Sequence, residues 1–273
     1  MKTRITFLFA IVSWSVYAQT DSIYTNNEKF ACTVKELTQD AVKYVYPGEE
    51  IINTVYKSTI QKIVFKSGRT QTFAEATSYK TVKGAEDFEN VTLTLVESEV
   101  NGLFKLGDVS SKAKGTTTLS SMEKVKERAN RKMKIVAAMM GANIIYLAQN
   151  TTTGNQYGSY FQAGKATETN LNGVAYSNKL PSYNDFEKLI GDKTLFQTYE
   201  RLKLGGSDSD FSTTQFSKTV QLFKIYNEAG LIMINAKIDG VDNNTFRVTS
   251  FSQNEFILVW KDGDKVYNFK IKI

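Results

Sequence analysis

Turn signals recur at short intervals through the last third of the chain, and this spacing most limits what the chain can fold into. They are Gly205-Gly206, 227–230, Asp239-Gly240, 252–254 and 262–264. Asp-Gly between alternating apolar runs is a strong hairpin signal. Residues 181–273 therefore predict a short helix at Tyr183–Ile190 followed by an antiparallel β-meander. Its expected strands are Thr194–Leu204, Thr219–Tyr226, Leu231–Ile238, Thr245–Phe251, Glu255–Trp260 and Lys265–Ile273.

The first part of the chain has the same character on a smaller scale. Val42, Tyr44 and Tyr46 alternate with other residues before Pro47-Gly48, and a second apolar run ends at Ser67-Gly68. Short strands of this kind need a closed or sandwiched sheet to bury their apolar face. We expect a small β-barrel or meander over residues 19–78.

The middle part, residues 79–180, changes to a helical period. Apolar residues at one helical face predict a helix over Ser120–Met140, capped by Ser120 or Ser121 and ended by Gly141. Strands are expected at Val91–Val100, Ala142–Ala148 and Thr169–Tyr176, which gives a β-α-β-β unit. The predicted fold class is α+β and rich in β-structure.

Residues 1–18 have the pattern of a secretory signal peptide. Lys2 and Arg4 precede an apolar run from Ile5 to Tyr17, and Ala18 is a small residue suited to cleavage. The run is too short for a bilayer-spanning helix, although a retained anchor is the alternative. We expect cleavage after Ala18, a periplasmic or secreted location and no later membrane span. Cys32 does not follow the cleavage site, so a buried thiol is expected rather than a lipid anchor.

Several short sequences resemble known families. The runs 102–107, 132–145 and 173–176 are similar to the small α+β domain of YbjQ-like proteins and of the Rcs envelope-stress sensor lipoprotein. The resemblance implies an envelope domain without an established reaction; the sensor's stabilising disulfides have no counterpart here. Residues 21–68 resemble small β modules of Gram-negative secreted proteins, and the final strands are faintly similar to lipocalin-like meanders.

Composition limits the possible chemistry. The 273 residues include no His and one Cys, which excludes Ser-His-Asp and Cys-His nucleophile systems and imidazole metal sites. Acidic runs at 207–210, 239–244 and 262–264 could offer oxygen ligands to calcium, but hairpin turns also explain them. We predict no catalytic, cofactor or metal residues.

A basic stretch provides the main candidate site. These positive charges could form a binding face for an anionic partner, or only a solvated surface on the side of the helix away from the core. The basic residues are Lys124, Lys126, Arg128, Arg131, Lys132 and Lys134. Net charge is +6, but an exported protein rarely meets nucleic acid, so none is expected as a partner.

The leading functional hypothesis is an exported, non-enzymatic protein that binds an unknown envelope protein or a glycan. One alternative is a carrier of a small apolar ligand, with the aromatic C-terminal meander as a cup. A second is a carboxylate-based hydrolase using Glu97 and Glu99 on one strand face.

Overall fold

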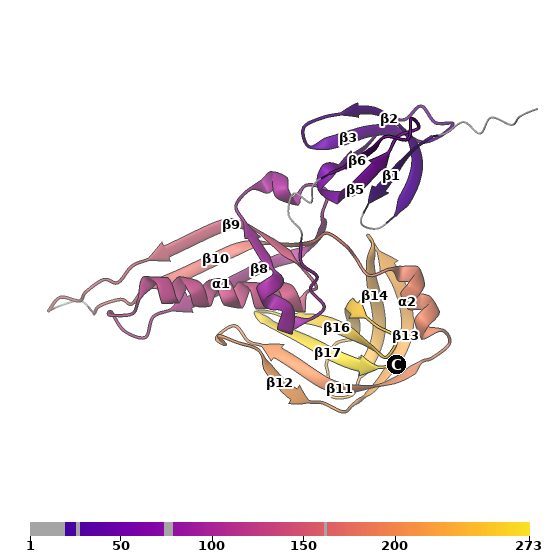
Figure 1. The fold of residues 1–273 in the computed structure, drawn as a ribbon. Helices are drawn as coiled ribbons and strands as arrows, with labels where there is room; N and C mark the ends of the chain where they lie inside the picture. Colours follow the sequence, from indigo (N-terminus) through magenta and orange to yellow (C-terminus); the bar gives the residue numbers. More distant parts are fainter. Residues whose placement is uncertain (1–19, 26–27, 74–78, 161–162) are drawn as a thin grey trace, which may run out of the picture.

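The computed structural model describes residues 20–25, 28–73, 79–160 and 163–273. They form three β-sheets of six, four and seven strands, and the protein is a β-rich α+β protein, as predicted (Figure 1). Each sheet lies within one of the three predicted regions. The expected signal peptide, residues 1–18, lies outside the described residues. Across the described ranges, no helix has the length and apolar character needed to cross a bilayer.

The N-terminal module is an antiparallel sheet with strand order β4-β3-β2-β1-β5-β6. Its inner residues, among them Ile23, Val42 and Ile63, form a separate core around Cys32. Burial, with a smaller contribution from the charge of Asp21, raises the pKa of the Cys32 thiol to about 11. The expectation of a buried thiol is confirmed. The strands are β1 (Asp21–Thr25), β2 (Lys29–Leu37), β3 (Ala41–Val45), β4 (Asn53–Tyr56), β5 (Ile60–Val64) and β6 (Thr70–Thr72).

The central module packs one long helix against a sheet of order β7-β9-β10-β8, in which only the β7–β9 pair is parallel. The Ser121 hydroxyl accepts the Lys124 backbone N–H at the start of the helix, and Gly141, at φ 75°, follows its end. The predicted helix is confirmed. The elements are β7 (Thr92–Thr94), β8 (Phe104–Lys114), α1 (Met122–Met139), β9 (Ile144–Thr153), β10 (Glu168–Ser177) and the 3-10 turns η2 (Ala85–Asn90) and η3 (Glu97–Val100).

Two predictions for this module were wrong. The strand expected over Val91–Val100 is limited to β7, because the Thr94 hydroxyl accepts the Val96 backbone N–H and turns the chain into η3. The unit is also β-β-α-β-β rather than β-α-β-β. The additional strand β8 is largely polar, with only Val109 and Ser111 buried along it, so its apolar signal is weak.

The C-terminal module is the predicted antiparallel meander, and it closes into a barrel. The strand β11 pairs with β13 and β12 along one edge and with β17 along the other, which joins the two ends of the sheet. The helix α2 (Tyr183–Ile190) forms as predicted and buries Phe186 in the barrel core. The strands are β11 (Leu195–Leu204), β12 (Ser212–Gln215), β13 (Thr219–Glu228), β14 (Leu231–Ile238), β15 (Thr245–Phe251), β16 (Glu255–Asp262) and β17 (Lys265–Lys272).

Side chains fill the interior of this barrel. Four of its Phe rings are at least 93% buried and make edge-on contacts in two pairs, Phe196 with Phe256 and Phe246 with Phe269. Phe186 of α2 packs against Phe256 and Phe251. Several of the aromatic residues that suggested a ligand-binding cup therefore pack together as the core of the barrel. The sequence did not indicate β12, whose four residues are all exposed and which pairs through its backbone.

The central module and the barrel share a core. Leu202, Leu204, Val259 and Val266 of the barrel belong to the same buried cluster as α1. Arg247 of β15 donates to the carbonyl oxygens of Leu106, at 3.1 Å, and Met140, at 2.7 Å. These contacts fix the barrel against the C-terminal end of α1.

Candidate functional site

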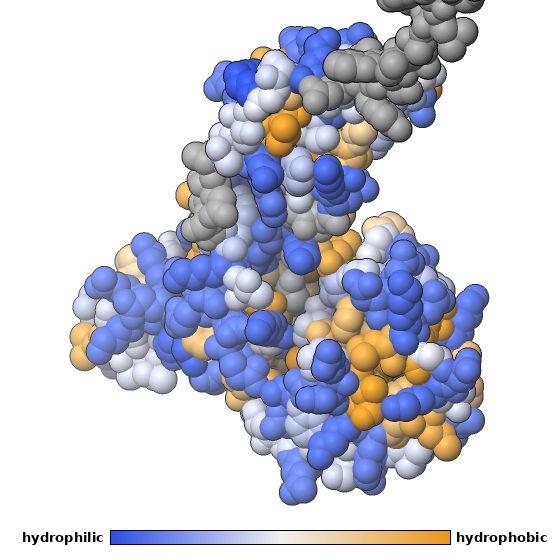
Figure 2. Space-filling model, turned by 45° about the vertical axis from the view of Figure 1, so that its right-hand side comes forward, coloured by the Kyte–Doolittle hydropathy of each residue, from blue (hydrophilic) through white to orange (hydrophobic). Residues whose placement is uncertain are grey.

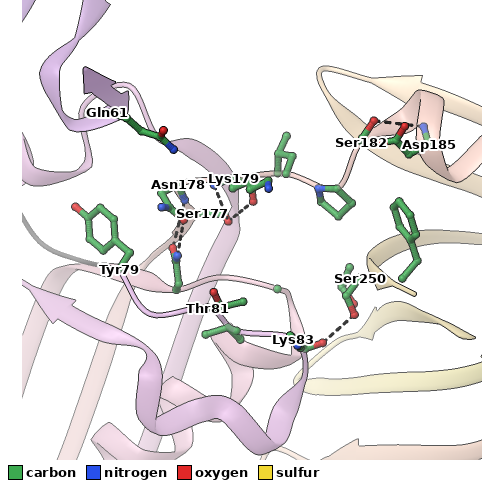
Figure 3. A pocket seen from close by; sticks show the side chains of 17 residues that line it. Gln61, Tyr79, Thr81, Lys83, Ser177, Asn178, Lys179, Ser182, Asp185 and Ser250 are labelled. Atoms are coloured by element: carbon green, nitrogen blue, oxygen red, sulfur yellow. Dashed lines mark hydrogen bonds between the residues drawn. The ribbon is translucent and has the colours of Figure 1, made fainter. Parts of the chain in front are cut away.

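A groove with a volume of about 820 Å³ lies where the three modules meet. Figure 3 shows its lining, which comes from the N-terminal module, the segment before η2, the end of β10, the start of α2 and the end of β15. Most of these side chains carry hydroxyl or amide groups. The lining residues are Gln61, Tyr79, Thr81, Val82, Lys83, Gly141, Asn143, Ser177, Asn178, Lys179, Leu180, Pro181, Ser182, Asp185, Thr249, Ser250 and Phe251.

Hydrogen bonds between side chains and backbone order the central wall of the groove. The Asn143 side-chain amide donates to the Asn178 Oδ1 at 2.6 Å, and its own Oδ1 accepts the Asn178 backbone N–H at 3.3 Å. The Ser177 hydroxyl donates to the Lys179 carbonyl at 2.6 Å. Asn143 follows the end of α1, and Ser177 ends β10, so packing of helix on sheet brings these groups together.

The opposite wall joins the central module to the barrel. The Ser250 hydroxyl of β15 donates to the Lys83 carbonyl at 2.8 Å, and the Lys83 N–H donates to the Asp87 carboxylate at 2.8 Å. The Ser182 hydroxyl caps α2 by accepting the Asp185 N–H at 3.3 Å. The groove is therefore built from groups that other contacts already hold in place.

The chemistry of the groove favours binding of a polar, uncharged ligand. A hydroxyl that donates to a carbonyl keeps acceptor capacity, and a side-chain amide offers both donors and an acceptor. Tyr79 and Phe251 add ring faces. Among the described lining residues, Asp185 is the single carboxylate, and Lys83 and Lys179 are the other charged residues. Acid-base glycosidic cleavage uses two carboxylates.

The structure divides the predicted basic face. Lys124, Lys126 and Arg128 are exposed on the first turns of α1, and Arg128 donates to the Lys114 carbonyl at 3.0 Å. Arg131 lies over the Phe88 ring and pairs with Asp210 at 2.6 Å. Lys134 is half-buried and lines a smaller cavity beside β7.

Lys132 corrects the expectation of a solvated face. Its side chain is buried and donates to the Gly206 carbonyl oxygen in the loop after β11. Burial lowers the pKa of Lys132, although the charges of Asp208 and Asp264 act in the opposite direction. Lys132 therefore anchors the barrel loop to α1. The sequence around Lys132 does not indicate this contact, because Gly206 lies 74 residues further along the chain.

Other predicted candidates are also placed by the structure. Glu97 and Glu99 lie in the turn η3 rather than on a strand face, which removes the expected geometry for a carboxylate pair. Glu99 lines a cavity of about 310 Å³ with Asp40, and Glu97 is not among its lining residues. Within the part of the chain that the structure describes, no group of three or more acidic or Cys side chains could hold a metal ion.

Comparisons with protein-family models, with curated proteins and with solved structures gave no significant match. The resemblance of the central module to YbjQ-like proteins stays a prediction. The sequence does not indicate the groove, because its walls come from separate stretches of chain. The polar run Ser177-Asn178-Lys179, which joins β10 to α2, was a partial signal for its central wall.

Proposed function

We propose that the protein is exported and binds a neutral glycan in the groove between its modules, without cleaving it. The observation that carries this proposal is the lining of the groove. Gln61, Thr81 and Ser182 are exposed and offer amide and hydroxyl groups to the groove. The part-buried Ser250 hydroxyl and the Ser182 cap are held by internal hydrogen bonds. Sugar hydroxyls both donate and accept hydrogen bonds, so they complement such groups.

The size and the rings of the groove also support a sugar ligand. A volume of about 820 Å³ lies within the range of ligand pockets, roughly 300–1,000 Å³. Phe251 and Tyr79 supply the apolar surface on which the C–H face of a sugar ring packs. Binding energy here depends on groups ordered before the ligand arrives, which reduces the entropic cost of association.

Titration with neutral cello-, malto- and chito-oligosaccharides tests the proposal. We expect binding to at least one series, with no release of new reducing ends. Thr81→Trp places a large side chain at the exposed wall of the groove and should weaken binding at least about tenfold, since it removes space for the ligand.

Thr213→Trp is the matched control. Thr213 is exposed on β12, away from the groove, and its substitution should change the affinity less than about twofold. Failure of all three oligosaccharide series to bind would contradict the proposal. Release of reducing ends that Asp185→Asn abolishes would show a hydrolase instead.

A further inference from the structure

The central module extends away from the barrel as an arm made of the β9–β10 hairpin, the outer half of β8 and the first half of α1 (Figure 1). Its outer end, called the tip below, consists of residues 115–122, 154–160 and 163–165. Four apolar or aromatic side chains of the tip are strongly exposed: Leu119 at 81%, Met122 at 42%, Tyr157 at 75% and Tyr160 at 96%. Figure 2 shows orange surface at this end of the molecule, bordered by blue.

Hydrogen bonds hold the segments of the tip together. The Asn155 side-chain amide donates to the Ser120 carbonyl at 2.9 Å, while its Oδ1 accepts the Thr167 N–H at 2.8 Å and the Thr167 hydroxyl at 2.9 Å. The backbones of Gln156 and Lys165 exchange both of their hydrogen bonds at 2.8 Å. The exposed side chains are therefore displayed by an ordered scaffold.

The tip itself carries one charged side chain, Lys165, and basic residues outnumber acidic ones in the rest of the arm. Segments 109–122 and 149–167 contain Lys112, Lys114 and Lys165 and no Asp or Glu, and Lys112 pairs with Glu168 at 2.8 Å. Next along the chain, the exposed first turns of α1 add Lys124, Lys126 and Arg128 against Glu123 and Glu127. An anionic surface would meet little repulsion here.

We propose that the tip docks on an anionic lipid bilayer surface. Tyr side chains favour the interface between water and lipid, and short apolar side chains such as Leu119 insert shallowly at that depth. Each lysine close to an anionic membrane strengthens binding about fivefold. Either apolar insertion or electrostatic attraction alone gives only marginal membrane binding, so stable binding needs both. The arm would hold the groove and the barrel away from the membrane.

Vesicle co-sedimentation of the full chain tests this proposal. We expect binding to vesicles of mixed phosphatidylglycerol and phosphatidylcholine, none to phosphatidylcholine alone, and release by high salt, which screens charges beyond a few ångströms. The double variant Leu119→Ser with Tyr160→Ser should bind at least about tenfold more weakly, because insertion is lost. Lys114→Gln with Lys165→Gln should bind about thirtyfold more weakly at low salt, given the lysine contribution above.

Leu195→Ser with Phe223→Ser is the matched control. These side chains are 65% and 60% exposed on the barrel, and their loss should leave sedimentation unchanged. Thr81→Trp should also sediment normally, which separates this proposal from glycan binding. The proposal is overturned if the wild type does not bind the anionic vesicles, if the tip variants bind as well as the wild type, or if the barrel variants lose binding equally.

Discussion

The two halves of α1 have different environments within one continuous helix. From Met122 to Arg131 only Val125 and Ala129 are buried, one turn apart on the face toward the sheet. From Lys132 to Met139 every residue except Lys134 is buried. The buried residues of the first half face its own sheet, and Arg131 at its end pairs with Asp210 of the barrel, whereas the second half is covered by the barrel as well as the sheet. The first half of α1 therefore belongs to an exposed arm that is accessible to ligands, and the second half holds the central module and the barrel together.

The largest expected effect tests that difference within the helix itself. Met139→Ala leaves a cavity at a fully buried site and should lower the free energy of unfolding by about 2–5 kcal/mol. Met122→Ala, at 42% exposure in the arm, should change it by less than about 0.5 kcal/mol. Urea unfolding followed by tryptophan fluorescence measures both. Equal losses of unfolding free energy in the two variants would show that the two halves of α1 contribute equally to stability.

A smaller effect is expected where the barrel clamps the end of α1. Burial lowers the pKa of Arg247 to about 10, and its guanidinium donates to the Met140 and Leu106 carbonyls near the negative end of the helix dipole. Arg247→Met leaves these carbonyls without that donor and should cost about 2–3 kcal/mol in unfolding free energy.

Lys237→Met, at an exposed position of β14, is the control for removal of one positive charge. It should be nearly neutral in the same urea titration. If Arg247→Met is equally neutral, packing alone joins the modules and the clamp is dispensable.

The smallest effect concerns the ion pairs of Lys270, which link β17 to η2. Its ammonium lies 2.8 Å from a Glu86 oxygen and 2.7 Å from a Glu200 oxygen. Burial opposes ionisation of Glu86, but the hydrogen bond from Lys270, together with a backbone bond and the Lys270 charge, outweighs it and lowers the Glu86 pKa. Because Glu86 is half exposed, Lys270→Met should cost only about 1 kcal/mol at neutral pH.

The sign of the pH dependence follows from the lowered pKa of Glu86. A carboxyl whose folded-state pKa is depressed stabilises the fold above its ordinary value, 4.5 here, and this contribution is lost as pH falls through the folded-state pKa. The difference between wild type and Lys270→Met should therefore shrink below pH 4.5. Glu86→Gln should show less of this change, and thermal unfolding at a series of pH values compares the three proteins.

Local pattern was enough to predict α1, α2 and six strands of the barrel. Their apolar residues recur with the period of a single helix or strand, and turn residues such as Asp239-Gly240 mark the ends. Elements without an apolar face were missed: β12 is exposed throughout, and β8 buries little. The groove was missed for a different reason, since Ser250, Asn143 and Lys83 become neighbours only when modules pack.

The amino-acid sequence alone determined the β-rich class, the position of the helices, and the absence of imidazole chemistry. Tertiary structure decided the pairing of β11 with β17, the burial of Lys132 under a barrel loop, and the exposure of the tip. These features depend on contacts between residues far apart in the chain. The free energy of such contacts comes from burying surfaces against each other, and the local spacing of apolar residues does not show which surfaces will meet.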